Sequence, residues 1–245
     1  MSASRGSGPV VVVQHEDACP VDRLGDWLQE AGATLDVRRP YAGDPLPARA
    51  PGGLVVLGGH MGAYDDADAP WLPATRDLLA TSAADGAPVL GICLGAQLLA
   101  VACGGRVEVG RAGIEAGVVD VSWLPAAADD PLFGDVAGTA DDPPAWPGPS
   151  MHLDAVVELP PGAVWLGRTP AYAHQVFRVG PAAWGVQFYP EVSLPTYRGW
   201  AERHADDWPG WGLDGDAVVE AHVRRDDELV RAGTRLAERF AALLR

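Results

Sequence analysis

The stretch Pro88-Val89-Leu90-Gly91-Ile92-Cys93-Leu94-Gly95-Ala96-Gln97-Leu98-Leu99-Ala100 decides the fold of this chain. An apolar run of strand length leads into a cysteine bracketed by two glycines, and a run of helix-forming residues follows at once. Glycines allow the tight turn that joins a strand to a helix and lifts one side chain above the sheet. The stretch therefore predicts a nucleophile elbow with Cys93 at its tip.

The place of Cys93 in this motif predicts a reactive thiol. The first turn of a helix presents unpaired N–H groups and the positive end of the helix dipole, and both stabilise a thiolate. The pKa of a free cysteine is about 8.5, and a helix N-terminus lowers it. We therefore expect Cys93 to be a nucleophile, whereas Cys103, further along the same helix, is typical of a small buried hydrophobe.

The first half of the chain alternates between strand and helix patterns. Short β-branched runs predict strands, and apolar residues at helical spacing predict two helices before the elbow, one ending at Gly32. The strands are expected at 10–14, 34–38, 54–57 and 89–92, and the helices at about 24–31 and 71–83. Together with the helix after Cys93, this alternation predicts an α/β fold with a doubly wound, mostly parallel sheet and helices on both faces.

The second half has a different pattern, with strands separated by Pro, Gly and Asp clusters and a long amphipathic helix at the end. The strands are expected at 106–109, 117–121, 155–159, 163–168, 172–179 and 184–188, and the helix at 216–244. Residues 129–149 are rich in Ala, Gly, Pro and Asp and predict a surface loop or a flap over the pocket. We expect a flexible N-terminus over 1–9 and one domain over 10–245.

Composition excludes several classes of function. The 245 residues carry a formal net charge of −15, so nucleic acid and anionic membranes are not expected partners. Three cysteines without CxxC or Cys/His spacing predict reduced thiols and no structural metal. No P-loop or GxGxxG motif is present, so no cofactor is expected. No signal peptide or membrane span is evident in the sequence, and we expect a cytoplasmic protein.

Two further motifs accompany the elbow. One is Val56-Leu57-Gly58-Gly59, followed by Asp65-Asp66 and Pro70-Trp71, and the other is Trp184-Gly185-Val186-Gln187-Phe188-Tyr189-Pro190-Glu191. With the elbow, they make the chain, from about Val10 to Glu191, resemble the class I glutamine amidotransferase domain. The resemblance is to the stand-alone form, similar to the glutaminase part of GMP synthase, and it implies a flavodoxin-like sheet.

The resemblance implies a role for particular residues. Cys93 corresponds to the nucleophile, and the backbone N–H groups of Gly59 and Leu94 to the oxyanion hole that stabilises the developing negative charge. Apart from the resemblance, the side-chain amides of Gln97 and Gln187 can offer donor and acceptor groups to a glutamine-like substrate, and the alternative is that they are ordinary polar residues of a helix surface and a strand.

The chain departs from the family at the catalytic base. The family has a histidine where this chain has Tyr189, and Glu191 would orient that histidine. A phenol, whose pKa is about 10, is a poor base at neutral pH, and loss of acid–base help typically costs about 10²–10⁴-fold in rate. Glu191 is expected to face the Tyr189 hydroxyl or the Cys93 thiol instead.

Three histidines are candidates for a compensating base or for substrate binding: His60, His152 and His174. His60 follows the oxyanion glycine, where the family often has proline. Met151-His152-Leu153-Asp154 occupies the place of a Trp-His-Gly-Asp type segment, so the resemblance favours His152 among the three. A lone histidine is more often a core or surface residue than a base.

Two hypotheses of different classes follow. In the first, Cys93 attacks an amide or acyl group, and the family implies glutamine or a γ-glutamyl conjugate as the small-molecule substrate. A separate, ammonia-accepting synthetase subunit would then be needed, unless Tyr189 serves as an acid or hydrogen-bond donor in a diverged acyl transfer of specialised metabolism. In the second, the fold is a binding or regulatory module without turnover.

Overall fold

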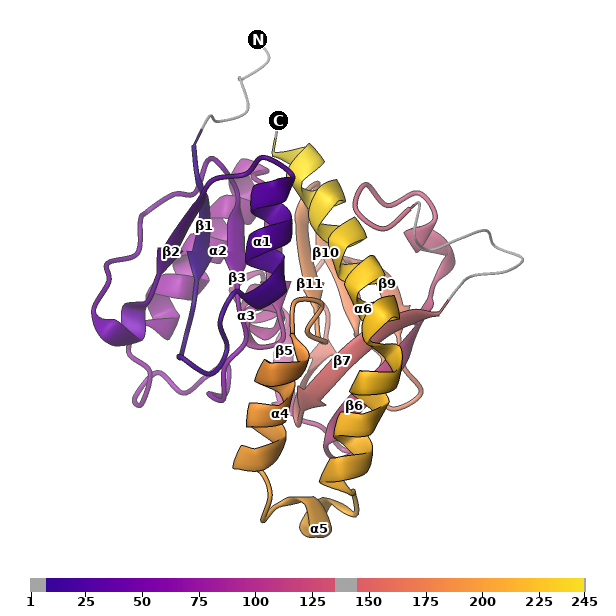
Figure 1. Cartoon of the computed structure of the whole chain (residues 1–245). Coiled ribbons are helices and arrows are strands. Elements are labelled where there is room, and N and C mark those ends of the chain that lie inside the picture. The colour runs from indigo at the N-terminus through magenta and orange to yellow at the C-terminus, as the bar shows by residue number, and fades with distance from the viewer. Residues whose placement is uncertain (1–7, 135–144, 245) are drawn as a thin grey trace.

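The computed structural model describes residues 8–134 and 145–244. Within them, nine strands form one sheet in the order β2-β1-β3-β4-β11-β10-β9-β6-β7 (Figure 1). Five neighbouring strands are parallel: β2 (Leu35–Arg38), β1 (Val10–Val13), β3 (Leu54–Val56), β4 (Val89–Ile92) and β11 (Ala183–Val186). The others continue the sheet by antiparallel pairing: β10 (Val176–Val179), β9 (Val164–Arg168), β6 (Glu115–Trp123) and β7 (Trp146–His152).

Helices cover both faces of the parallel half. On one face α1 (Asp22–Glu30) and α6 (Gly215–Leu243) pack against the sheet, and on the other face α2 (Leu72–Asp85) and α3 (Leu94–Ala102) do so. The remaining helices are α4 (Leu194–Arg203), which packs on α6, and the short α5 (Trp208–Trp211). A separate pair of strands, β5 (Arg106–Val109) and β8 (Asp154–Glu158), lies beside α3. The predicted doubly wound α/β fold is confirmed, with an antiparallel half added to the parallel sheet.

Strand β1 shows why the apolar runs form central strands. Successive side chains of a strand point to opposite faces of the sheet, so a strand buried on both faces needs an unbroken apolar run. Val10 and Val12 join the core beneath α1 and α6, and Val11 and Val13 join the core beneath α2 and α3. All four are at most 5% exposed.

About half of the described residues of the predicted flap, 129–149, are buried in the core, so the prediction of a surface segment is wrong for them. Leu132 and Phe133 are fully buried, and Phe133 packs against Trp123 and Trp146. β7 pairs with β6 along its whole length. The physical reason is that burying these aromatic rings outweighs the turn propensity of the surrounding Pro, Gly and Asp residues. Residues 135–144 lie outside the described residues.

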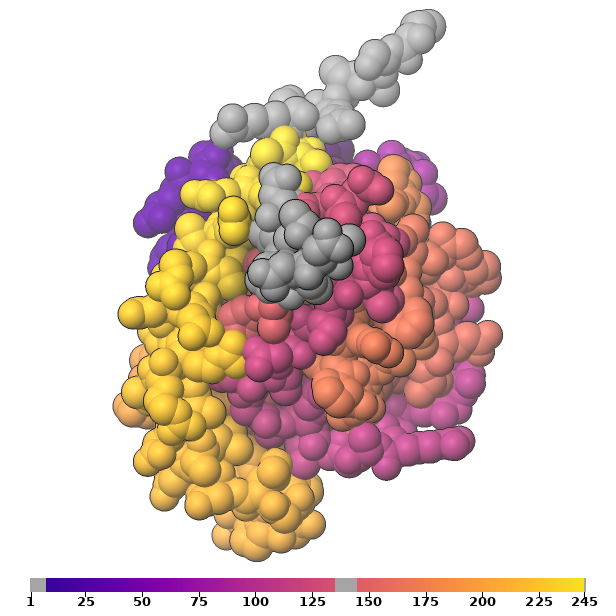
Figure 2. Space-filling model, turned by 90° about the vertical axis from the view of Figure 1, so that its right-hand side faces the viewer, coloured from indigo at the N-terminus to yellow at the C-terminus, as the bar shows by residue number. Residues whose placement is uncertain are grey.

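The long terminal helix is as the sequence predicts. Figure 2 shows α6 running along most of the height of the molecule, beside the antiparallel half of the sheet. Asp214 caps its start by accepting hydrogen bonds from the N–H groups of Asp216 and Ala217. Within 8–134 and 145–244, no helix is both long and apolar enough to cross a membrane. The sequence predicts a flexible N-terminus over 1–9, and residues 1–7 of it lie outside the described part of the chain.

Candidate active site

The elbow places Cys93 between β4 and α3. Its φ is +49° and its ψ is −105°, a backbone conformation that L-residues rarely adopt and that costs on the order of 1–3 kcal/mol. The turn needs glycine at Gly95, because a Cβ there would lie 2.0 Å from the carbonyl oxygen of Val56. The sequence prediction of a tight strand-to-helix turn is confirmed.

We expect Gly95→Ala to destabilise the fold by more than about 2 kcal/mol, because the added methyl group meets β3 backbone that cannot move aside cheaply. Urea unfolding followed by circular dichroism measures this. Gly199→Ala in α4 is the matched control, since nothing lies within 4 Å of its added Cβ, and it should stabilise the protein slightly. Equal stability of Gly95→Ala and the wild type would contradict the packing at the elbow.

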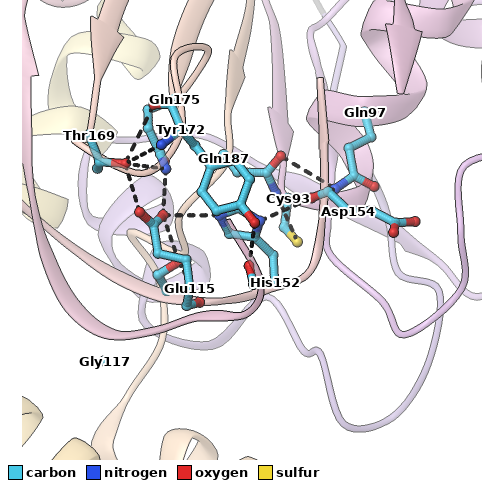
Figure 3. Close-up of polar contacts among 12 residues, drawn as sticks. Cys93, Gln97, Glu115, Gly117, His152, Asp154, Thr169, Tyr172, Gln175 and Gln187 are labelled. Carbon is cyan, nitrogen blue, oxygen red and sulfur yellow. Dashed lines mark hydrogen bonds and ion pairs between the residues drawn. The ribbon is translucent and has the colours of Figure 1, made fainter. Parts of the chain in front are cut away.

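The sulfur of Cys93 is surrounded by hydrogen-bond donors. The hydroxyl of Tyr189 and the backbone N–H of Leu94 both donate to it. The side-chain amide of Gln187 lies 3.5 Å from it, measured from Nε2 to Sγ (Figure 3). These donors favour the thiolate, but among the described residues no side chain that could act as a base at neutral pH hydrogen-bonds the thiol.

Burial decides the protonation state of Cys93. The side chain is only 4% exposed, and burial raises the pKa of its thiol to about 12, against the smaller lowering by Tyr189 and Leu94. The sequence-based expectation of a lowered pKa is therefore not met in this structure. The reason is that desolvation of the sulfur raises the pKa by more than the hydrogen-bond donors at the start of α3 lower it.

The loop after β3 brings Gly59 against the elbow. A Cβ on Gly59 would lie 3.2 Å from Leu94 Cδ2, so the two residues whose N–H groups are candidates for the oxyanion hole are neighbours. The Leu94 N–H already points to the sulfur. Gly59 and Leu94 therefore lie next to each other at the elbow.

Tyr189, at the position where the resemblance implies a histidine, lies beside Cys93 and Gly58. Its ring lies over Gly58, where a Cβ would be 2.5 Å from Tyr189 Cε1, and it packs on Trp200 with ring centroids 4.6 Å apart. Burial, followed by the nearby Cys93 and Cys19, raises the pKa of the Tyr189 hydroxyl well above its ordinary value. The hydroxyl is therefore a proton donor at neutral pH.

Glu191 is a buried carboxyl group without the partner that a histidine would supply. It is 3% exposed, and its Oε2 has no hydrogen-bond partner among the described residues. Burial raises its pKa to about 8, although its own backbone N–H acts in the opposite direction. The expected hydrogen bond from Glu191 to the Tyr189 hydroxyl or the Cys93 thiol is not formed.

Gln97 points into the protein beside the elbow. Its side-chain amide donates to the backbone carbonyl of Asp154 at 2.9 Å and to Gln187 Oε1 at 3.3 Å (Figure 3). Because Gln187 in turn reaches Cys93, these contacts link the helix α3 to the strand end that carries Tyr189. Gln97 therefore positions Gln187, and its N–H groups are occupied in this structure.

His152 belongs to a buried network on the other side of Gln187. Its Nε2 lies 3.0 Å from Glu115 Oε2, and its Nδ1 lies 3.0 Å from the carbonyl oxygen of Asp154 (Figure 3). Both ring nitrogens therefore face acceptor oxygens, and neither bonds the Cys93 sulfur. In this structure His152 does not contact the thiol as the compensating base that the resemblance favours would.

Glu115 holds this network together. Its carboxylate also accepts from Thr169 Oγ1 at 2.7 Å and Gln175 Nε2 at 2.5 Å. Burial alone would raise the pKa of Glu115, but the hydrogen bonds from His152, Thr169 and Gln175 lower it below its ordinary value. The carboxylate therefore stays ionised opposite His152.

The other two candidate histidines lie apart from the sulfur. His174 bonds the carbonyl oxygen of Val156 through Nδ1 at 2.8 Å and packs on Trp165. The side chain of His60 is 72% exposed and pairs with Glu16, with Nδ1 3.1 Å from Oε2. His60 lines the pocket beside Gly59, so it is placed to meet a substrate, and no hydrogen bond to Cys93 is formed by any histidine of the described chain.

His15 is a site residue that the sequence did not single out. It is fully buried next to Gly59, and burial lowers its pKa to about 4, so it is neutral. The indole N–H of Trp71 donates to its Nδ1 at 3.0 Å, which occupies the accepting nitrogen. Its place directly after β1, at the carboxyl edge of the sheet, is the signal that could have identified it.

A pocket of about 410 Å³ opens next to the elbow. The loops after β1 and β3, strand β7 and helix α4 supply its walls. Tyr189, which interacts with Cys93, is part of the lining, and Cys93 is not. The lining residues are Glu16, Cys19, Gly59, His60, Met151, Tyr189, Trp200, Arg203 and His204. The sequence alone identified Gly59, His60 and Tyr189 and missed the contribution of α4. The sequence does carry a signal for the start of this helix. Ser193 is a typical N-cap residue and Pro195 is favoured in the first turn.

Comparisons with known proteins identify the family of this chain. The family model described as glutamine amidotransferase class-I matches residues 23–200. The chain is 35% identical over 162 residues to the glutamine-hydrolysing GMP synthase of Thermomicrobium roseum, a match that covers 63% of this chain and 26% of the relative. It is 36% identical over 107 residues to a glutamine-hydrolysing GMP synthase subunit from Halobacterium salinarum, covering 43% and 54%. The matches thus span about half or less of these relatives' own length.

Solved structures match over almost the whole chain. A glutamine amidotransferase from Methylobacillus flagellatus superposes with a TM-score of 0.83 at 27% identity, covering 97% of this chain and 95% of that chain. A glutamine amidotransferase from Thermotoga maritima gives a TM-score of 0.80 at 26% identity, covering 95% and 97%. With a family model that matches most of its length and an elbow of the expected form, this chain belongs to the class I glutamine amidotransferase family.

Proposed function

We propose that the chain is a slow, cysteine-dependent acyl-transfer enzyme that acts on an amide. Cys93 Sγ attacks the amide carbonyl carbon, and the carbonyl oxygen takes the negative charge within reach of the Gly59 and Leu94 N–H groups. The C–N bond then breaks, the amine leaves with a proton, and water or an amine resolves the thioester. With water as the acceptor, an amide and water give an acid and an amine.

The conformation of Cys93 is the observation that carries this proposal. A cysteine at positive φ is strained, and strain of this kind persists where the surrounding structure enforces it, commonly at active sites. The same turn exposes the start of α3 to the sulfur. A cysteine that only filled the core would need neither feature.

The proton route explains why we expect slow turnover. Tyr189 can pass a proton without ionising once its hydroxyl turns from the sulfur to the departing amine: its oxygen then accepts the thiol proton while its own proton goes to the amine. Because burial raises the pKa of both the Cys93 thiol and the Tyr189 hydroxyl, the thiolate is scarce at neutral pH. Without a histidine, the rate should be about 10²–10⁴-fold below that of an enzyme with an intact base.

The proposed substrate is glutamine or a γ-glutamyl conjugate, and the support for it is the family and the relatives named as glutamine-hydrolysing enzymes. The relative from Halobacterium salinarum is one of the subunits of a GMP synthase. By analogy, ammonia released here would pass to a separate synthetase subunit.

A binding or regulatory module is the second candidate, and two observations favour it. The Cys93 thiol is neutral at rest, and Glu191 Oε2 lacks the partner that would complete a triad. A module of this kind would bind the amide in the same pocket without cleaving it.

Wild-type protein should release ammonia slowly from glutamine, and Cys93→Ala should reduce the release to the rate without enzyme, because no other described thiol lies at the elbow. A coupled ammonia assay measures turnover, and intact-protein mass spectrometry detects the thioester. Cys103→Ala is the matched control and should keep the wild-type rate. Tight binding of glutamine with no ammonia and no thioester would favour the binding module.

A further inference from the structure

We propose that the groove between α4, α5 and α6 is a docking surface for a protein partner, which seats a cationic amphipathic helix in it. The groove has a volume of about 770 Å³ and lies at the end of the molecule where α5 joins α4 to α6 (Figure 1). It shares no lining residue with the pocket beside the elbow. The inference goes beyond the proposed function and does not depend on it, because docking needs no turnover.

The floor of the groove is apolar, and Trp208 holds it in shape. The indole N–H of Trp208 donates to the carbonyl oxygen of Ala201 in α4 at 2.9 Å. Its ring lies against Gly215 at the start of α6, where a Cβ would be 2.5 Å from the indole nitrogen. The groove is therefore built before any partner arrives. Its apolar lining residues are Ala201, Ala205, Trp208, Pro209, Leu213 and Val219.

The apolar surface continues along α6 beyond the groove. Val223 follows Val219 by one helical turn, so the two side chains lie on the same face of the helix. Val223 is 46% exposed and is one of five large hydrophobic side chains exposed in the described part of the chain. An elongated apolar stripe suits a partner helix, whose anchoring side chains recur every three or four residues, better than it suits a compact small molecule.

The rim of the groove is acidic. Its charged lining residues are four carboxylates and one guanidinium: Glu202, Asp214, Asp216, Glu220 and Arg198. No ion pair joins two of these described residues, and Glu220 pairs instead with Arg224 outside the groove, with Oε2 3.4 Å from Nη1. With Arg224 counted, four carboxylates still face two guanidinium groups. The groove therefore presents a net negative charge to a partner.

This combination defines the chemistry of the partner. An apolar floor with an acidic rim is complementary to an amphipathic helix whose polar face carries lysine or arginine. The net charge of −15 on the whole chain attracts a cationic partner and opposes a second copy of the same chain. Because α4 and the turn after it also supply Trp200, Arg203 and His204 to the pocket beside the elbow, the partner would sit next to that pocket.

The test measures the binding of two peptides of about four helical turns to the full chain. Both carry leucine on one face, and the other face carries lysine in one peptide and glutamate in the other. Fluorescence anisotropy at low salt should give a dissociation constant at least about tenfold lower for the lysine peptide, and added salt should weaken its binding. Glu202→Gln combined with Glu220→Gln should raise that dissociation constant about fivefold. Ala205→Phe, which adds a ring at the groove without changing the charge, should raise it as well.

Glu30→Gln combined with Glu238→Gln is the matched control, because both residues are exposed outside the groove and the change in net charge is the same. It should raise the dissociation constant of the lysine peptide by less than about twofold. Equal binding of the two peptides, no binding of the lysine peptide, or an equal loss in the control and groove variants would overturn the proposal.

Two other occupants of the groove would give different results. A dimer in sedimentation experiments that dissociates in Ala205→Phe would place a second copy of the chain in the groove and overturn the proposal. Lysine-peptide binding that is unchanged in Ala205→Phe but is displaced by spermidine would identify a polyamine site and would overturn it too.

Discussion

Tyr189→His should raise the rate of ammonia release from glutamine by at least about tenfold. An imidazole, whose pKa is about 6.5, accepts the Cys93 proton near neutral pH, whereas the Tyr189 hydroxyl has a raised pKa and can only relay one. The structure already holds Glu191 as a buried carboxyl group whose Oε2 has no partner in the described part of the chain and can accept from the new ring. Steady-state kinetics with a coupled ammonia assay measure the gain.

Two variants control this experiment. Cys93→Ala in the Tyr189→His background should abolish the gain, and Tyr189→Phe should show the loss of the relay without adding a base. Thermal unfolding of each variant verifies the fold, because the smaller ring leaves space over Gly58 and beside Trp200. A folded Tyr189→His protein that releases no more ammonia than wild type would mean that glutamine is not the substrate of this pocket.

Glu191 should make the protein less stable as the pH rises. Its pKa is about 8 in the folded state and near 4.5 when unfolded, so the folded state holds the proton more tightly. The stabilisation is complete below about pH 4.5 and is lost as the pH rises through about 8, a change on the order of 3–5 kcal/mol between these limits. Urea unfolding at about pH 5 and about pH 8.5 measures it.

Glu191→Gln isolates this effect from other titrating groups, because the amide has the same shape and does not ionise. The variant should resemble wild type at the lower pH and be clearly more stable than wild type at the higher pH. Glu30→Gln, at the exposed end of α1, is the matched control and should retain the wild-type dependence. If wild type and Glu191→Gln lose the same stability between the two pH values, the buried carboxyl group is not protonated in the folded state.

The sequence by itself determined the architecture of the parallel half and the position of the thiol. Val10–Val13 and Val89–Ile92 are short apolar runs whose side chains fill both faces of a sheet, and this follows from local spacing alone. The elbow at Cys93 follows from the glycines on either side of it, Gly91 and Gly95, between an apolar run and a helix-forming run. Such signals lie within a few residues of each other, so they can be recognised in the sequence without the folded structure.

The tertiary structure decided the chemistry of the site. Burial of Cys93 reversed the expected direction of its pKa shift, since desolvation depends on residues packed around the sulfur from β11 and the loop after it. The motif favoured His152 as a base, but its Nε2 is paired with Glu115, which lies 37 positions away in the sequence. Arg203 reaches the pocket only because α4 packs beside the carboxyl edge of the sheet. Local spacing determines which residues form strands and turns, but which side chains are desolvated or paired is set by contacts between segments far apart in the chain.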